Sequence, residues 1–478
     1  MIAARLGARL SVAAGLAVLA GLVLTMRAPA RADAPAWVWS GAITTTSAII
    51  KGVHSGRGPR PSVEIAPAPD FADATRLEAT ALPAPTRREP AREVLSFAAT
   101  SLAPATRYHY RYGTPDTGWL TGRFTTFGEG PYSFSVAFSA CAGGTFPFGT
   151  GLLSSVSNAR VFEAIEQLAP TFFLHTGDFH YRNIGTRCAP DCDDDFRRAY
   201  DAVLTQPRQA SLYRHVPIVY MWDDHDYGPN DSDRTSPSRD EARRNYLAHV
   251  PHYPLVAEGA AARGPIQQAF DVGRVRFLVT DTRSERDRWD GRPSPDGLSM
   301  LGATQRDWLL REFERSRDAA LVVWVNTVPW ITKREERADR VSKHGWGPYR
   351  DERREIANAI ARLGLEKRLV MLSGDAHMVA IDDGTNSNYS DDPTTRGFPV
   401  VHAAPLDRRT SLKGGDYSHG YSRQNGQFAV MAVDDDGETL AVAFRTYVER
   451  GGRATPLPGL TLEVRCAGGE CRVGNERK

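Results

Sequence analysis

Four short apolar runs in this chain each end in residues that could bind a metal ion. The residues at their ends are Cys141, then Asp178 with Tyr181, then Asp223-Asp224-His225-Asp226, and finally Asp375 with His377. In an open α/β sheet, residues just beyond the carboxyl ends of neighbouring strands converge on one crevice. Carboxylates, imidazoles, a thiolate and a phenol in one crevice would suit a mixed metal centre. The pattern therefore predicts a metal-dependent hydrolase.

Within this set, Asp178 is the best candidate to bridge two metal ions. A carboxylate offers two oxygens, and the preceding Gly177 permits a tight turn at the strand end. The alternative for Asp178 is a carboxylate that caps a helix. Asp375 and His377 are two residues apart, so strand alternation directs both side chains to the same side. We therefore expect both of them to face the metals.

The cysteines divide into two local pairs and one residue left over. Cys188 and Cys192 are separated by three residues, and Cys466 and Cys471 by four. Each pair is close enough in sequence to form a disulfide in an oxidising compartment. Cys141 remains, and its position at a strand end beside the other candidates favours metal ligation over a buried core role.

The first 32 residues have the features of a signal peptide, which include two arginines, an uncharged apolar stretch and an Ala-x-Ala cleavage site. An uncleaved membrane anchor is the alternative. The mature protein is expected to be exported to the periplasm, cell surface or exterior, without a transmembrane segment. The formal net charge is only +2, from 59 basic and 57 acidic residues, which is no nucleic-acid-binding signature.

The composition changes along the chain and predicts three regions after the signal peptide. Residues 35–127 carry short alternating runs spaced by Gly, Pro and Ser, which are typical of a β-sandwich. Residues 131–450 alternate strand and helix patterns, with helices expected at 161–168 and 304–313. Thr304 is the expected N-cap of the second helix. Residues 451–478 are expected to form a C-terminal tail with a local disulfide.

The motifs together resemble the calcineurin-like metallophosphoesterases, and specifically the alkaline phosphatase D (PhoD-like) family. They are Ser139-Ala-Cys141, Gly177-Asp-Phe-His-Tyr181, Trp222-Asp-Asp-His-Asp-Tyr-Gly-Pro-Asn230-Asp, Thr280-Asp-Thr-Arg283, Trp346-Gly-Pro-Tyr349 with Glu352-Arg353, and Gly374-Asp-Ala-His377. Each motif is weak alone, but their order over some 240 residues is specific. The implied fold is α/β, an αββα sandwich with mixed sheets, preceded by a fibronectin III-like β-sandwich.

The resemblance also implies roles for individual residues. Cys141 and Tyr181 would favour ferric iron, while Asp178 and Asp375 would suit calcium or another hard divalent ion, giving a binuclear Fe³⁺ and Ca²⁺ centre. Without the resemblance, Tyr181 would be read as a strand-end aromatic. Either Asp224 or Asn230, or both, would bind the second metal.

The remaining roles concern the substrate. His225 takes the position that contacts the phosphate, where it would stabilise the transferring phosphoryl group or protonate the leaving alkoxide. His377 joins the metal ligands, and Arg283 and Arg353 are candidates to hold phosphate oxygens. The expected activity is hydrolysis of phosphate monoesters or diesters through attack by a metal-activated hydroxide. The alternatives are a phospholipase D-like or teichoic-acid phosphodiesterase acting on a phospholipid or other phosphodiester, and a non-catalytic cell-surface binding protein.

Overall fold

The computed structural model describes residues 34–56, 58–81, 92–144, 155–185, 188, 192–256, 264–289, 297–332 and 344–474. The predicted signal peptide lies outside these residues. Among the helices of the described residues, none is long and apolar enough to cross a membrane.

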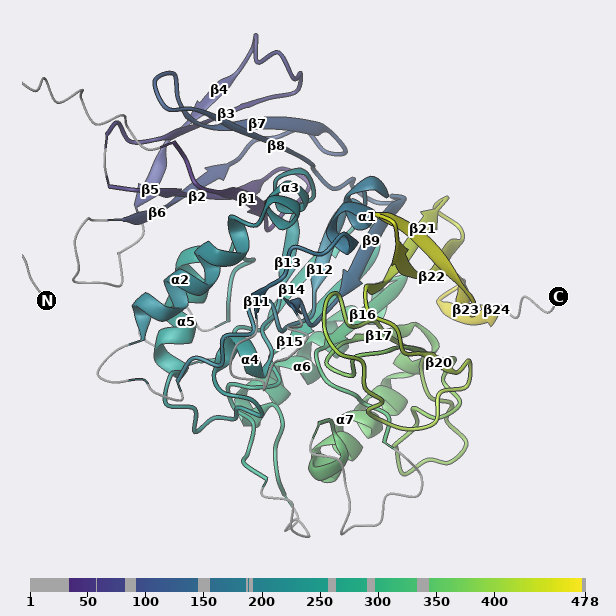
Figure 1. Cartoon of the computed structure of the whole chain (residues 1–478). Coiled ribbons are helices and arrows are strands. Elements are labelled where there is room, and N and C mark those ends of the chain that lie inside the picture. Colours follow the sequence, from purple (N-terminus) through teal and green to yellow (C-terminus); the bar gives the residue numbers. More distant parts are fainter. Residues whose placement is uncertain are drawn as a thin grey trace, which may run out of the picture.

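The elements follow the order of the chain in Figure 1. The helices are α1 (Val161–Gln167), α2 (Asp193–Leu204), α3 (Pro207–His215), α4 (Asp224–Tyr227), α5 (Arg239–His249), α6 (Gly302–Arg315) and α7 (Arg350–Leu363), with short 3₁₀ turns at Ser316–Asp318, Gly347–Tyr349 and Leu365–Lys367. The strands are β1 (Val38–Gly41), β2 (Ala48–His54), β3 (Ser62–Ala66), β4 (Thr75–Leu77), β5 (Ala79–Ala81), β6 (Glu93–Ala99), β7 (Arg107–Thr114), β8 (Gly118–Thr125), β9 (Phe134–Ser139), β10 (Gly143–Gly144), β11 (Ser155–Val156), β12 (Phe172–His175), β13 (Ile218–Tyr220), β14 (Gln268–Val272), β15 (Val275–Thr280), β16 (Leu321–Asn326), β17 (Leu369–Ser373), β18 (Val379–Asp382), β19 (Val400–His402), β20 (Tyr421–Ser422), β21 (Gln427–Asp435), β22 (Leu440–Arg450), β23 (Arg453–Ala467) and β24 (Glu470–Gly474).

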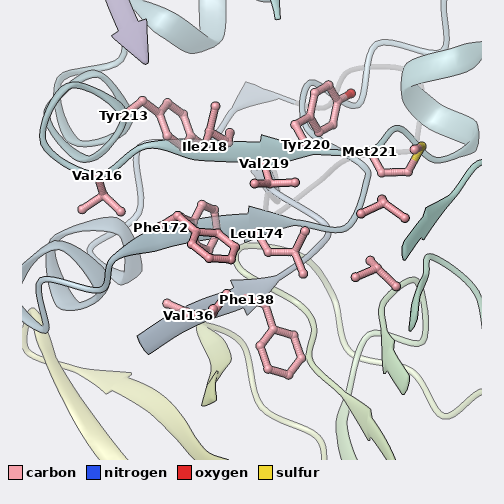
Figure 2. Close-up of a cluster of buried hydrophobic side chains, with 14 of the residues drawn as sticks. Val136, Phe138, Phe172, Leu174, Tyr213, Val216, Ile218, Val219, Tyr220 and Met221 are labelled. Carbon is pink, nitrogen blue, oxygen red and sulfur yellow. The ribbon is translucent and has the colours of Figure 1, made fainter. Parts of the chain in front are cut away.

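Two mixed sheets form the centre of the molecule. The larger sheet has the order β24-β23-β22-β21-β9-β12-β13-β1-β2-β6-β5, and the smaller has the order β14-β15-β16-β17-β19-β18-β20. In the larger sheet β9, β12 and β13 are parallel, and Figure 2 shows these three strands side by side with their apolar side chains. In the smaller sheet β15, β16 and β17 are parallel. These parallel strands carry the candidate ligands at their carboxyl ends.

The central strands of the larger sheet are buried on both faces, which explains the continuous apolar run in β12. Phe172 packs against Phe277 of the smaller sheet, with ring centroids 5.6 Å apart. The next residue, Phe173, points to the opposite face and stacks on Tyr213 of α3 at 6.4 Å. Because successive strand residues face opposite sides, a run without polar breaks requires cover on both faces. The order of layers is therefore helices, larger sheet, smaller sheet and helices.

The outer face of the smaller sheet is covered by α6 and α7. Phe313 of α6 packs edge-on against Trp324 of β16, with centroids 5.7 Å apart. The sequence predicts that this helix starts with Thr304 as N-cap, and this is wrong, because α6 begins at Gly302. The Ser299 hydroxyl accepts a hydrogen bond from the Gly302 amide at 2.7 Å. The first amides of a helix have no partner within the helix, and this contact gives the Gly302 amide one. The helix therefore starts two residues before Thr304.

The N-terminal strands are joined to the larger sheet. Strands β1, β2, β6 and β5 extend it beyond β13, while β4, β3, β7 and β8 form a separate sheet that Figure 1 shows above them. Tyr112 of β7 packs against Phe97 of β6 at 6.0 Å, so the two layers share apolar contacts. The likeness of residues 35–127 to a fibronectin III module stays a prediction.

The segment after residue 450 differs from the tail that the sequence predicts. In the structure it forms β23 and β24, which complete one edge of the larger sheet. The sulfur atoms of Cys466 and Cys471 lie at disulfide distance, as do those of Cys188 and Cys192. Cys141 is buried and is the remaining cysteine.

Candidate metal centre

Residues from both sheets meet in one buried group at the carboxyl ends of the parallel strands. Three sets of potential ligand atoms lie within 4.8 Å of one another; the sets are Cys141-Asp178-His377, Asp178-Asp224-His225 and Asp178-Asp223-Asp375. We call Asp178, Asp223, Asp224 and Asp375 the acidic cluster; all four are at most 4% exposed. Asp178 belongs to all three sets, which is the position that a bridging ligand requires.

The backbone at these strand ends is strained. Non-glycine residues rarely adopt positive φ, yet five of the predicted ligands do: Cys141 (62°), Asp178 (59°), Tyr181 (58°), Asp375 (57°) and His377 (51°). Such conformations cost free energy and occur where the surrounding structure enforces them, commonly at functional sites. The strain therefore indicates that these turns serve to aim side chains at one point.

Two contacts hold the turn that carries Asp178 against the turn after β13. Gly177 has φ of 102°, and a Cβ at this position would lie 2.4 Å from Cβ of Asp223. Only glycine allows this approach. On the other side, the Asp226 carboxylate accepts hydrogen bonds from the amides of Phe179 and His180 at 2.8 and 3.0 Å. Asp226 thus orders the turn rather than facing the acidic cluster.

The thiol, the phenol and one imidazole lie on one side of Asp178. Cys141 Sγ is 3.5 Å from Asp178 Oδ2, and Tyr181 Oη is 3.0 Å from His377 Nε2. His377 Nδ1 is 2.7 Å from the carbonyl oxygen of Arg409. Since a carbonyl only accepts, Nδ1 carries the proton and the Nε2 lone pair faces the site. A histidine that binds a metal through Nε2 needs this arrangement.

The same burial disfavours charge on these groups. Burial, with the negative charge of Asp178, raises the pKa of the Cys141 thiol and of the Tyr181 phenol well above their ordinary values. Burial, with the positive charge of Lys413, lowers the pKa of His377 to about 4. A thiolate and a phenolate at this position therefore require a compensating cation.

Two of the cluster carboxylates have a cationic partner each. Arg283 Nε lies 2.5 Å from Asp223 Oδ1, and its Nη2 lies 3.9 Å from Asp224. Lys413 Nζ lies 2.7 Å from Asp375 Oδ1. Burial alone would raise the carboxylate pKa values, but Arg283 brings that of Asp224 below its usual range, and Lys413 does the same for Asp375.

The remaining negative charge is not neutralised by groups of the described residues. Burial and the neighbouring carboxylates raise the pKa of Asp178 and Asp223 well above the usual range, in Asp223 against the pull of Arg283. Among the described residues, nothing donates a hydrogen bond to Asp178 Oδ1, Asp223 Oδ2 or Asp375 Oδ2, and all three oxygens are buried. Buried oxygens without a partner are costly. Because these three residues form one set within 4.8 Å, a metal cation fits them.

His225 lies at the edge of the acidic cluster, where its ring nitrogen forms one of the three sets with Asp178 and Asp224. Its ring stacks on that of Tyr181, with centroids 4.1 Å apart, and its Nδ1 is 2.6 Å from Asn183 Oδ1. Its Nε2 is 4.0 Å from Asp224 Oδ1. The ring is thus held in one orientation at the edge of the site.

The structure separates some of the predicted alternatives. Asp224 is buried in the cluster and accepts from the Asp231 amide at 2.6 Å, whereas Asn230 is exposed and donates to Asp231 Oδ2. The geometry favours Asp224 as the ligand. Arg353 donates to the carbonyl of Trp330 and lies over the ring of Tyr389, 3.6 Å from its centroid. Its predicted phosphate contact stays a prediction.

Comparison with known proteins identifies the family. The PhoD-like phosphatase family matches residues 138–439, a span that contains all the motifs at the strand ends. The chain belongs to the PhoD-like phosphatases. No curated protein sequence matches it. Membership of this family indicates that the chain is a phosphoric ester hydrolase.

Solved structures agree with the PhoD-like fold. A structure of PhoD is 17% identical, with a TM-score of 0.68, and the match covers 94% of each chain. The purple acid phosphatase PPD1 from yellow lupin (Lupinus luteus) seeds is 13% identical, with a TM-score of 0.59 over 93% of this chain and 78% of that chain. At these identities the likeness concerns the fold alone.

Three residues of this PhoD-like site had no individual role in the sequence prediction. Asp223 directly precedes the predicted Asp224, so the Asp-Asp-His-Asp run already contained the signal. Asn183 lies two residues beyond Tyr181 in a turn with positive φ (53°), which asparagine tolerates. Lys413 gave no signal, because it belongs to none of the motifs and lies in the irregular segment between β19 and β20.

Proposed function

We propose that this PhoD-like protein is an exported phosphoesterase that hydrolyses phosphate esters at a binuclear metal centre. The observation that carries the proposal is the set of three buried carboxylate oxygens without partners among the described residues, from Asp178, Asp223 and Asp375. Export is supported by the two cysteine pairs at disulfide distance, which suit an oxidising compartment.

The residues present fit two ions of different character. Cys141, Tyr181, His377 and one Asp178 oxygen would offer a thiolate, a phenolate, an imidazole and a carboxylate, a mainly anionic donor set that suits ferric iron. Asp223, Asp224, Asp375 and the second Asp178 oxygen offer hard oxygen ligands, which suit calcium or a similar divalent ion. When bound, the ions would polarise the phosphoryl oxygens and make water a stronger nucleophile at neutral pH.

The protein groups then position the substrate and move the proton. His225 Nδ1 donates to Asn183 Oδ1, so a proton delivered to the leaving alkoxide must come from Nε2 of the imidazolium form. Asp224 Oδ1, 4.0 Å from Nε2, stabilises that positive charge. Arg283 holds Asp223 in place and offsets the charge of the acidic cluster.

The test is an assay of the exported, metal-loaded protein on phosphate monoesters, diesters and phospholipids, with and without a chelator. We expect hydrolysis of at least one ester class, its loss on chelation and its return on metal addition. Asp416→Asn, a change at an exposed residue between β19 and β20, serves as a control that keeps activity. Chelator-resistant hydrolysis would contradict the proposal, and a protein inert towards every ester would favour the binding-protein alternative.

A further inference from the structure

We propose that Arg408 contacts the phosphoryl oxygens of the substrate and makes this site selective for dianionic phosphate monoesters over monoanionic diesters. The inference rests on the proposed phosphoesterase function, and it assigns a role to a residue that no sequence motif marks. It follows from how the backbone around Arg408 is fixed and from what its side chain contacts.

Arg408 belongs to residues 404–413, which we call the strap, a segment that crosses both turns of metal-ligand candidates. The amides of Leu406 and Asp407 donate to the carbonyls of Ala140 and Cys141, at 2.9 and 3.1 Å. On the other side of Arg408, the Arg409 carbonyl accepts from His377 Nδ1 at 2.7 Å. Arg408 is therefore flanked on both sides by residues bonded to candidate ligands, so its position relative to the metal centre is fixed.

The strap continues to hold the second turn after Arg409. The amide of Ser411 donates to the carbonyl of His377 at 3.2 Å, and Lys413 reaches Asp375. The Arg408 amide itself donates to Asn425 Oδ1 at 3.1 Å. A segment with this many contacts can present a side chain in one orientation, which specific recognition requires.

The guanidinium of Arg408 lies against the site. Its central carbon is 4.2 Å from the centroid of the Tyr181 ring, the same ring on which His225 stacks. In the part of the chain that the structure describes, no hydrogen bond or ion pair engages this guanidinium. Its donors are thus available, and a guanidinium presents them in a geometry that matches phosphate oxygens.

The other cations at the site are already engaged. Arg283 is bonded to Asp223, and Lys413 is bonded to Asp375. Their charges offset the acidic cluster, whereas the charge of Arg408 has no such partner among the described residues. A monoester brings two negative charges at neutral pH and a diester brings one, so an additional cation stabilises the bound monoester more.

The experiment compares two substrates with the same leaving group, nitrophenyl phosphate and methyl nitrophenyl phosphate, on the metal-loaded protein. Arg408→Gln is expected to lower kcat/KM for the monoester by about 10- to 100-fold, the effect of losing one hydrogen bond to a charged group. The diester should lose less than about threefold, because it carries one charge fewer and one free oxygen fewer. Arg408→Lys should recover part of the loss, since it restores the charge without the planar fork.

The matched control is Arg396→Gln, which removes the same charge from an exposed residue in the segment before β19. It should leave both substrates unchanged, and metal content should be equal in all variants. Equal losses on both esters, or loss of metal in Arg408→Gln, would show a merely structural role and overturn the inference. So would Arg408→Gln behaving as Arg396→Gln does.

A second readout separates this inference from the proposed function. Calorimetric titration with inorganic phosphate should give a Kd about 10- to 100-fold weaker in Arg408→Gln than in Arg396→Gln. If the wild type hydrolyses neither ester, the proposed function fails, and the phosphate titration still decides whether Arg408 binds the anion. Equal phosphate affinity in the two variants would refute the role of Arg408 in either case.

Discussion

The imidazole of His225 stacks on the phenol ring of Tyr181, with ring centroids 4.1 Å apart and an angle of 27° between the planes. The proposed proton donor, His225, and the proposed metal ligand Tyr181 are therefore in contact by ring stacking. The two roles of Tyr181 can therefore be separated by substitution. Phenylalanine keeps the ring that stacks on His225 and lacks the hydroxyl that would bind the metal.

The first prediction concerns colour. If Cys141 and Tyr181 bind ferric iron, the purified protein should show a visible ligand-to-metal charge-transfer band. Tyr181→Phe should remove or shift this band and lower activity, yet keep the stack under His225. Cys141→Ser should also shift the band, measured by absorption spectroscopy. A colourless, iron-free and fully active wild type would contradict the assignment of both ligands.

The second prediction concerns His225. Because its ring is oriented by Asn183 and lies beside the cluster, His225→Ala should retain the metals and lower kcat by about 10²–10⁴, the usual effect of losing a general acid. The deficit should shrink on nitrophenyl esters, whose leaving group needs no proton. Metal analysis together with kcat on alkyl and nitrophenyl phosphates checks this. Loss of metal in the variant would instead make His225 a ligand.

The third prediction concerns the turn before Asp178. Gly177→Ala adds a Cβ that would lie 2.4 Å from Asp223 at a φ of 102°, so it should destabilise the fold by about 2–4 kcal/mol and weaken metal binding. Gly297→Ala is the matched control, because Gly297 has φ of 91° but an added Cβ would meet no atom of the described residues within 4 Å. In denaturant unfolding, the control should lose about 1 kcal/mol of the free energy of unfolding. Equal effects would show that backbone strain alone matters at Gly177.

The fourth prediction concerns pH and the junction with the N-terminal strands. Burial lowers the pKa of Lys51 in β2 to about 7, while its Nζ donates to the carbonyls of Leu247 and Ala248 at 2.6 and 3.2 Å. In the unfolded chain a lysine has a pKa of about 10.4. Between these two values the unfolded chain binds the extra proton, so the free energy of unfolding should rise with pH there.

Lys51→Met removes that titration. The stability of the wild type relative to this variant should therefore increase from about pH 7 towards pH 10, with a slope of at most about 1.4 kcal/mol per pH unit. Urea unfolding of both proteins over this range measures it. A difference that does not change with pH would mean that Lys51 keeps an ordinary pKa in the folded protein.

Most strands of the catalytic region could be predicted from sequence because their apolar runs are long and buried on both faces. Phe172 and Phe173 contact different layers, and such two-sided burial leaves an unmistakable pattern. The edge strands β23 and β24 were missed because they alternate polar and apolar residues, and a partly exposed edge resembles a loop in composition. Pairing between β1 and β13 joins segments far apart in the chain, and no local pattern encodes it.

The residues of the site also fall into a group that the sequence predicts and a group that it does not. The predicted ligands at strand ends are brought together because parallel strands present their carboxyl ends at one edge. Lys413 and Arg408 were not predictable, since the strap reaches the site only through tertiary hydrogen bonds to the turns at Cys141 and His377. In the structure Arg283 is bonded to Asp223, and its predicted phosphate contact stays a prediction. The sequence carries no sign of which anion an arginine contacts.

The central claim is that Asp178 joins two metal ions and that phosphate ester hydrolysis depends on them. The most direct measurement is the metal content of purified wild type and Asp178→Asn, beside Asp416→Asn as control, with hydrolysis measured on the same samples. We expect two metal equivalents and full activity in the wild type and the control, and loss of both metal and activity in Asp178→Asn. Full metal occupancy and full activity in Asp178→Asn would contradict the claim.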